Sequence, residues 1–560
     1  MPHATSMPYP GFQAIILCGP GLSLNTFTAN PEDFPKALVP IANRPMVWYP
    51  MDWCYRMGIT NIHLVTPPSS LQAIQTALAQ NPHLTSLPAP KPDILAPLEL
   101  LQNTPTAEVL RFPEVQAAIT GDFLILPCDL VCELPGESLL EAWMIQQGSL
   151  GGSTYDLNGY NGSRGIVGER GGRRGGLGVW FETKGDDSTK GTETDFVITT
   201  RLPQPAAAPP ANSLRPNISK LLYATTTDTL RDITEEKKGF PIRTGLIRKH
   251  GKIRMLTTHR DAHIYLLPHW VLEMIKQNEK LESMSEDVIG WWAKASWQDG
   301  LAEKLHLRQV LDPSSSAEED GKDGETRSHV RSNHVEDEID LASMSSTYIS
   351  STPERRSPPS ASPKPKPQFT IPPILSYIHP TTTTSGKPTP LIRRVDTPHL
   401  LLHTSLHLAS LAPTTDPATT AHSYAQKISS EASIAPHTNI YAPTTLIAPN
   451  TTVATHAVIK TTVIGANCEI GENVRLTGCL LMDGVVVKEK CVLQGCILGR
   501  RCHVGGESNL RECEVQEGFR VPEKTEGKGE KFMVSEGLEL GGDVEEDGDV
   551  DVMGDEGTVE

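Results

Sequence analysis

The chain has 560 residues, which is enough for three or four domains at the usual roughly 100–200 residues each. Apolar residues make up only 38% of it and there are 46 prolines, so we expect part of the chain to remain outside any packed core. The formal net charge is −17, and residues 523–560 supply 11 of those charges (14 acidic minus 3 basic). The rest is only mildly acidic, which argues against direct binding to nucleic acid or to an anionic membrane surface.

The N-terminus and the cysteines indicate the compartment. The first twelve residues lack the basic and apolar regions of a secretory signal, and no apolar run approaches the ~18 residues that span a bilayer. We therefore expect a cytosolic protein whose ten cysteines are reduced. Six of them lie between Cys468 and Cys513 with the spacing of a repeat, unlike the close pairs of zinc ligands, so no metal site is predicted.

Strand and helix signals alternate in the N-terminal half. Residues 12–17, 61–66 and 122–126 are apolar runs that predict buried strands, and a helix that Pro50 could kink is predicted between Pro45 and Gly58. This alternation predicts an α/β domain over residues 11–311, with a largely parallel sheet covered by helices on both faces. A run rich in Gly and Arg near residues 165–178 is predicted to be a surface insertion, because it is too short and too poor in aromatic residues for an RNA-binding segment.

A different pattern governs the C-terminal half. Residues 312–368 contain no Trp, Phe or Cys and predict a disordered linker, followed by a connecting segment, residues 369–430, packed on the core. From residue 431 to 522 apolar residues recur every six positions, as at Ile434, Ile440 and Leu446. That period is typical of a left-handed parallel β-helix, here of four or five turns. Residues 523–560 predict a disordered acidic tail.

The loop after the first predicted strand carries the candidate chemistry. Gly19 and Gly21 allow backbone N–H groups to approach a phosphate, and Lys36, in the run Phe-Pro-Lys-Ala-Leu-Val-Pro-Ile, can neutralise it. Asp129 directly follows another predicted strand, which is where α/β sheets place their ligand sites.

These motifs resemble the nucleotidyltransferase domain of sugar-1-phosphate nucleotidyltransferases such as mannose-1-phosphate guanylyltransferase. The resemblance implies a three-layer Rossmann-like fold in which Gly19 and Gly21 hold the nucleotide, Lys36 contacts phosphate and Asp129 binds the catalytic magnesium. Two departures argue against activity: Pro20 replaces a loop glycine and removes an N–H donor, and Ser23 stands where the enzymes carry a charge-stabilising Arg. We therefore predict a vestigial pocket with no catalytic residue and no resident cofactor, in which residual nucleotide or sugar-nucleotide binding remains open.

A second resemblance covers more of the chain. The runs that carry it are residues 43–50 (Asn-Arg-Pro-Met-Val-Trp-Tyr-Pro), 128–130, 261–265, 283–289 and 473–482. They are similar to the gamma subunits of eukaryotic translation initiation factor 2B, in which a β-helix also follows the α/β domain. The resemblance implies a non-catalytic subunit of the guanine-nucleotide exchange factor for initiation factor 2. It implies as partners the epsilon and other subunits of that factor, with GDP-bound initiation factor 2 as the substrate complex.

Enzymatic alternatives stay open at this point. One is a working sugar-1-phosphate guanylyltransferase or its regulatory homologue, and another is an acyltransferase that uses His456 or His503 of the β-helix. His263, in Asp-Ala-His-Ile-Tyr, is interpreted as a buried histidine with satisfied hydrogen bonds, because no nucleophile or partner is indicated beside it.

Overall fold

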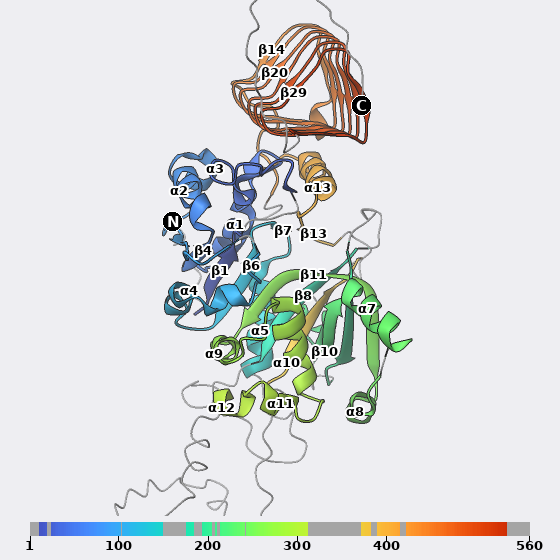
Figure 1. Ribbon diagram of the computed structural model, residues 1–560. Coiled ribbons are helices and arrows are strands. Elements are labelled where there is room, and N and C mark those ends of the chain that lie inside the picture. Colours follow the sequence, from blue (N-terminus) through green and yellow to red (C-terminus); the bar gives the residue numbers. More distant parts are fainter. Residues whose placement is uncertain are drawn as a thin grey trace, which may run out of the picture. The chain divides into compact units, whose positions relative to one another are not determined.

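The computed structural model describes residues 11–19, 24–101, 103–148, 175–183, 193–203, 208–209, 213–240, 242–311, 371–381, 389–414 and 422–534 (Figure 1). They fall into two compact units. The first consists of residues up to Pro20 and Val47–Arg394, and the second of Gly21–Met46 together with the chain from Val395. The predicted linker at residues 312–368 lies outside the described residues.

The first unit is built on a nine-stranded sheet with the order β5-β4-β1-β6-β11-β8-β12-β10-β9. The strands are β1 Gln13–Leu17, β4 Ile62–Val65, β5 Asp93–Leu95, β6 Phe123–Pro127, β8 Gly176–Glu182, β9 Asp195–Arg201, β10 Ile218–Thr226, β11 Ile253–Leu267 and β12 Ile374–His379. Strands β5, β4, β1 and β6 run parallel to one another, and β11 runs antiparallel to β6. Because β9 pairs with β11 as well as with β10, the strands from β11 to β9 close into a ring.

Helices cover both faces of this sheet. Described in chain order, they are α1 Trp48–Arg56, α2 Leu71–Gln80, α3 Pro82–Thr85, α4 Pro113–Ala118, α5 Gly136–Gly148, α7 Thr227–Lys237, α8 Thr244–Lys249, α9 Trp270–Gln277, α10 Gly290–Ala295, α11 Leu301–Lys304 and α12 Leu307–Leu311. Side chains alternate along β6: Phe123 and Ile125 join the core formed with α9 and α10, whereas Leu124 faces Trp53 of α1 and Leu140 of α5. The three-layer α/β/α arrangement follows from this alternation.

The structure modifies three sequence-based expectations for this unit. Pro50 lies in the first turn of α1, where a missing N–H costs no helical hydrogen bond. The last residues of the predicted insertion near 165–178 belong to β8. There the rings of Trp292 and Trp180 lie so close to Gly176 and Gly178 that a Cβ would meet each ring at 2.8 Å. The domain predicted to end at residue 311 also takes β12 from the connecting segment, and this strand lies between β8 and β10.

The second unit is a parallel β-helix with three flat sides. Each side is a sheet of six short parallel strands, in the orders β14-β17-β20-β23-β26-β29, β15-β18-β21-β24-β27-β30 and β16-β19-β22-β25-β28-β31. They run from β14 (Ser433–Ile434) to β31 (Lys531–Phe532). Ile447, Ile464 and Leu481 show the stacking of the interior, because each pairs with its equivalent one coil later. The described β-helix therefore has six coils, more than the four or five expected, and its last strands occupy residues of the predicted acidic tail.

The cysteines of the β-helix are interior residues. All six from Cys468 to Cys513 are buried free thiols, and several donate to backbone carbonyls, as Cys496 Sγ does to the Leu510 oxygen at 3.3 Å. Burial accordingly raises the pKa of Cys468 to about 12. None of the described helices combines the length with the apolar sequence that a bilayer-spanning segment requires.

One side of the β-helix is covered by other parts of the same unit. Four of the outward side chains on this side, Leu446, Val463, Leu480 and Ile497, are at most 3% exposed. Helix α13, Pro398–Ser410, packs against β19 and β22 of this side, and Asn43 Nδ2 donates to the Ile464 carbonyl at 2.9 Å. The guanidinium of Arg500 lies 3.8 Å from the ring centre of Phe34. The N-terminal segment around Lys36 is thus built into the β-helix unit.

Gly465 provides a test of the β-helix packing. A Cβ at this position would meet the Asp483 backbone nitrogen and the Met482 carbonyl carbon at 2.7 Å, so the neighbouring coil would have to move. We expect Gly465→Ala to destabilise the second unit by about 1–3 kcal/mol, measured by thermal unfolding. Gly506→Ala is the matched control, because its Cβ would meet no atom closer than 3.5 Å. Equal unfolding midpoints for the two variants would contradict this packing.

Candidate functional site

The structure places Gly19 and Asp129 at the same edge of the sheet. Strands β1 and β6 are parallel neighbours, and the Cys128 N–H donates to the Leu17 carbonyl at 3.1 Å, which aligns the two residues that follow these strands. A Cβ at Gly19 would meet no atom of the described residues within 4 Å. Gly21 lies outside the described residues, as do Pro20 and Ser23.

Lys36 is not part of this unit. It begins the short helix Lys36–Leu38, is half-buried, and belongs with the β-helix. The physical reason is the packing of its segment on that unit through Asn43 and Phe34. The structure therefore brings Gly19 and Asp129 together within one unit and assigns Lys36 to the other. The pocket of four residues stays a prediction.

Asp129 is paired with an arginine that sequence reasoning did not select. Its carboxylate is 2% exposed, and Arg394 Nε lies 3.6 Å from its Oδ1. Strand β13, Ile392–Arg394, holds the arginine there by pairing antiparallel with β7, Leu130–Cys132, so that Arg394 lies opposite Leu130. A guanidinium at this distance neutralises the carboxylate that a divalent cation would need.

Two further carboxylates lie at this site because β11 is irregular. Its register shifts between Asp261 and Tyr265, and His263 adopts a left-handed φ of 52° in between. The Asp261 N–H donates to Asp195 Oδ2 at 2.5 Å, and the Tyr265 hydroxyl donates to the Asp261 carboxylate. Burial first, and the neighbouring Asp195 second, raise the pKa of Asp261 to about 7, and burial raises the pKa of Asp195 to about 6.

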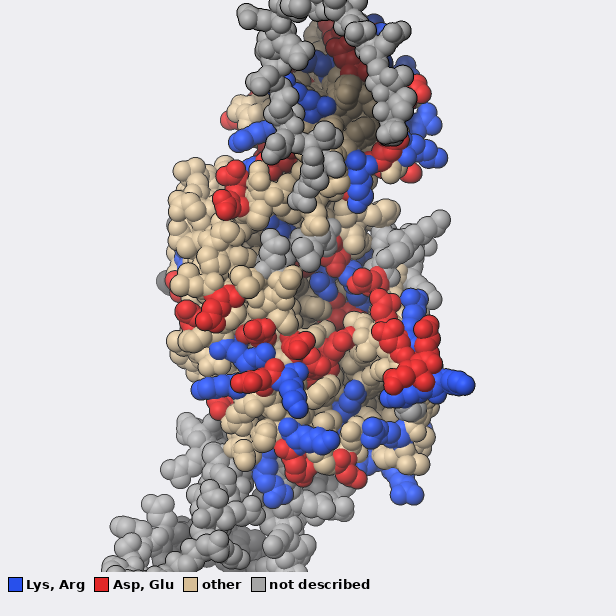
Figure 2. All heavy atoms as spheres, viewed as in Figure 1, with Lys and Arg blue, Asp and Glu red and all other residues tan. Residues whose placement is uncertain are grey.

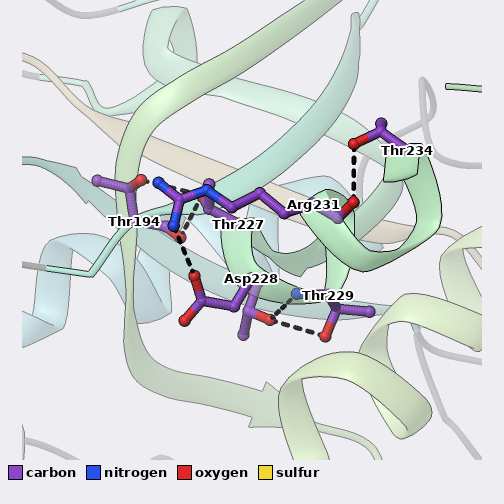
Figure 3. Close-up of polar contacts among 7 residues, drawn as sticks. Thr194, Thr227, Asp228, Thr229, Arg231 and Thr234 are labelled. Carbon is purple, nitrogen blue, oxygen red and sulfur yellow. Dashed lines mark hydrogen bonds and ion pairs between the residues drawn. The ribbon is translucent and has the colours of Figure 1, made fainter. Parts of the chain in front are cut away.

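Asp195, His263 and Arg394 border a cavity of about 530 Å³. It is lined by Glu193, Thr194, Asp195, Thr226, Thr227, Asp228, Arg231, Arg260, His263, Ser285 and Arg394. Figure 3 shows polar contacts around α7, where the Thr227 hydroxyl donates to the Thr194 carbonyl at 2.5 Å; both threonines also line the cavity. Contrary to the sequence-based expectation, His263 is only half-buried and faces this cavity.

The charges in the cavity wall are balanced. Each arginine of the wall forms an ion pair. Arg231 Nη1 lies 3.2 Å from Asp228 Oδ1, and Arg260 Nη2 lies 3.9 Å from Glu193 Oε2. Arg394 pairs with Asp129. Three neutralised arginines offer a triphosphate little net positive charge. Among the described residues, no three His, Cys, Asp or Glu side chains are placed to hold a metal ion. The residues present do not fit a magnesium site at Asp129, and we derive no magnesium-dependent step there.

Two comparisons with known proteins agree with this architecture. Residues 424–526 match the family model of the eIF2B subunit epsilon LbH domain, a left-handed β-helix, which confirms the predicted fold of this region. The chain is also 24% identical over 302 residues to the translation initiation factor eIF2B subunit gamma of Schizosaccharomyces pombe. That similarity covers 54% of this chain and 55% of the relative, so the chain spans about half the length of the curated relative it matches.

The chain thus combines an α/β unit with a left-handed β-helix unit and is similar to subunits of eIF2B. The two matches name different subunits, epsilon for the β-helix and gamma for the longer similarity. The 302 matched residues outnumber the 166 from Val395 to Glu560, so the similarity to the gamma subunit extends beyond the β-helix.

Proposed function

We propose that this chain is a non-catalytic subunit of the guanine-nucleotide exchange factor for translation initiation factor 2. The observation that carries the proposal is the similarity to an eIF2B gamma subunit over 302 residues, which requires residues outside the β-helix as well. The match of the β-helix to an eIF2B domain model supports it independently.

The candidate site supports the non-catalytic part of the proposal. Nucleotidyl transfer needs charge stabilisation on the transferring phosphate, commonly from a metal ion and a positively charged side chain. In this chain Arg394 faces Asp129 at 3.6 Å, and the other cavity arginines are paired with carboxylates. Gly19 and Asp129 then have a structural role at the edge of the sheet. Gly21 and Lys36 then bind no phosphate.

The proposed partners follow from the subunit assignment. The chain would form a stable heterodimer with the epsilon subunit through both its α/β unit and its β-helix, within an assembly that contains the other eIF2B subunits. The heterodimer would bind initiation factor 2 in its GDP-bound form in the cytosol. This chain would raise the exchange rate without contributing a residue to the exchange site.

A turnover assay separates this proposal from the enzymatic alternative. The purified chain is incubated with GTP, mannose-1-phosphate and magnesium, and product is followed by chromatography of GDP-mannose and by pyrophosphate release. We expect no turnover above that of the protein-free reaction. Turnover that is lost in Asp129→Ala would overturn the proposal and establish a working guanylyltransferase.

A further inference from the structure

A second cavity of the α/β unit lies where β9 and β10 meet helices α7, α8 and α10, and it shares no lining residue with the cavity near Asp129. Its volume is about 150 Å³. Three aromatic side chains form its walls, Tyr223, Phe240 and Trp297, and three cationic side chains line it, Lys237, Arg243 and Lys294. Helices α7 and α8 are the green elements beside β10 in Figure 1.

The cavity is preformed and has the size of one aromatic ring. The rings of Tyr223 and Phe240 stack at 6.2 Å between centres, and the Trp297 indole donates to the Leu222 carbonyl at 2.8 Å, which fixes its orientation. A cavity of about 150 Å³ with apolar walls is large enough to bind benzene. A single phenyl or indole group therefore fits the space.

Its charge is one-sided, in contrast to the balanced cavity near Asp129. Among its described lining residues there is no Asp or Glu, whereas Lys, Arg, Asp and Glu side chains are interspersed over the face of the α/β unit that Figure 2 shows. The Lys294 ammonium lies 4.0 Å from the centre of the Tyr223 ring. Burial and the nearby Arg243 lower the pKa of Lys294 to about 8, and the carboxylates of Asp287 and Glu286 partly oppose this shift. The segment from Lys237 to Arg254 contains seven Lys and Arg residues and no Asp or Glu, in a chain whose net charge is −17.

Apolar surface continues beyond the mouth of the cavity. Ile242, which lines it, is 47% exposed, and Ile247 on α8 is 55% exposed. Lys237 and Arg243 are also exposed, and no ion pair engages either of them among the described residues. A ligand larger than one ring can therefore contact isoleucine and cationic side chains outside the cavity while its ring fills the inside.

We propose that this cavity and its cationic rim bind an acidic peptide segment of a partner protein, with one aromatic side chain of that segment as the anchor. Binding energy in peptide sites commonly comes from an aromatic anchor in a pocket. Rim charges opposite in sign to those of the peptide then add specificity and speed association. A membrane would need apolar side chains that protrude from the surface, whereas here the aromatic residues form a recess. Single-stranded nucleic acid would need exposed ring faces for stacking, but Tyr223 and Trp297 are only 7% and 6% exposed.

The test uses the full chain and a fluorescein-labelled synthetic peptide of twelve residues that has one Trp between Asp and Glu residues. Anisotropy titration at low salt is expected to show saturable binding. The double variant Lys237→Glu/Arg243→Glu should weaken it by about tenfold or more, because it reverses the rim charges. Lys276→Glu/Lys280→Glu is the matched control: it changes the net charge equally at two exposed lysines of the same unit and should leave the affinity unchanged.

Further measurements distinguish the contribution of the aromatic anchor to affinity from that of the rim charges. Replacing the peptide Trp with Ala should weaken binding by about tenfold, and Ile233→Trp, which fills the cavity, should do the same. The acidic peptide corresponding to residues 535–560, which has no aromatic residue, should bind no better than the Ala peptide. The proposal is overturned if the control double variant weakens binding as much as the rim variant, or if the Ala peptide binds equally well. Tighter, rim-dependent binding of phosphatidylserine vesicles or single-stranded RNA than of the peptide would also overturn it.

Discussion

Replacing Arg394 with alanine is expected to destabilise the α/β unit by about 3–5 kcal/mol, because it leaves a buried carboxylate without its counter-charge. Asp129 is 2% exposed and Arg394 only 17% exposed, so solvent screens this pair little. Burial raises the pKa values of Asp195 and Asp261, and the Arg394 guanidinium partly opposes that rise. Chemical denaturation of the full chain, followed by tryptophan fluorescence, measures the loss.

A double-mutant cycle distinguishes loss of the charge pair from loss of packing. In the Asp129→Asn background, Arg394→Ala should lower the free energy of unfolding clearly less than in the natural chain, since no buried charge remains at position 129. Arg393→Ala is the matched control, because this neighbouring half-buried arginine of β13 contacts the Phe181 ring and the Glu182 carbonyl of β8. Equal costs of Arg394→Ala in the two backgrounds would show that the arginine does not neutralise Asp129.

The second large effect is a dependence of stability on pH through Asp261. Its pKa is about 7 in the folded chain and 3.8 in an ordinary aspartate. Between these values the folded state holds a proton that the unfolded state has lost, so the free energy of unfolding falls as pH rises from about 4 to 7. Asp195, with a pKa of about 6, changes stability in the same direction. Above pH 7 both Asp261 and Asp195 are ionised in the folded chain, and the free energy of unfolding no longer changes through these two groups.

Asp261→Asn removes this titration while it keeps an oxygen that can accept from Tyr265. We expect the variant to be more stable than the natural chain at pH 7.5, by on the order of 2–4 kcal/mol, and equally stable near pH 4. The difference in the free energy of unfolding between the two proteins reports on the Asp261 carboxyl alone, because all other titrating groups are common to both. A constant difference from pH 4 to 7.5 would contradict the assignment of the raised pKa to Asp261.

The regular parts of the fold were predictable from local patterns. The apolar runs at residues 12–17, 61–66 and 122–126 correspond to β1, β4 and β6, and the six-residue period corresponds to the coils of the β-helix. Both signals are local, because alternation along a strand and repetition along a coil are visible within a few residues. The last coil was missed because its strands, Glu526–Lys528 and Lys531–Phe532, are charged and carry a single large apolar residue.

The contacts that define the candidate site could not be predicted in the same way. Arg394 reaches Asp129 only because β13 pairs with β7 across more than 250 residues of sequence, and no local pattern specifies that pairing. The bulge that brings Asp261 to Asp195 interrupts an otherwise regular strand, and only the singled-out run Asp-Ala-His-Ile-Tyr pointed to this position. The assignment of Lys36 to the β-helix unit depends on packing by Asn43 and Phe34, which are separated from their partners by hundreds of residues.

The most direct test of the proposed role is the rate of GDP release from initiation factor 2. Release of a fluorescent GDP analogue is followed with an eIF2B epsilon subunit alone, with this chain alone, and with the two combined after co-purification. We predict that this chain alone leaves the rate unchanged, that the pair exceeds the epsilon subunit alone, and that Asp129→Asn in this chain does not reduce the gain. A chain that neither co-purifies with the epsilon subunit nor changes its rate would contradict the account.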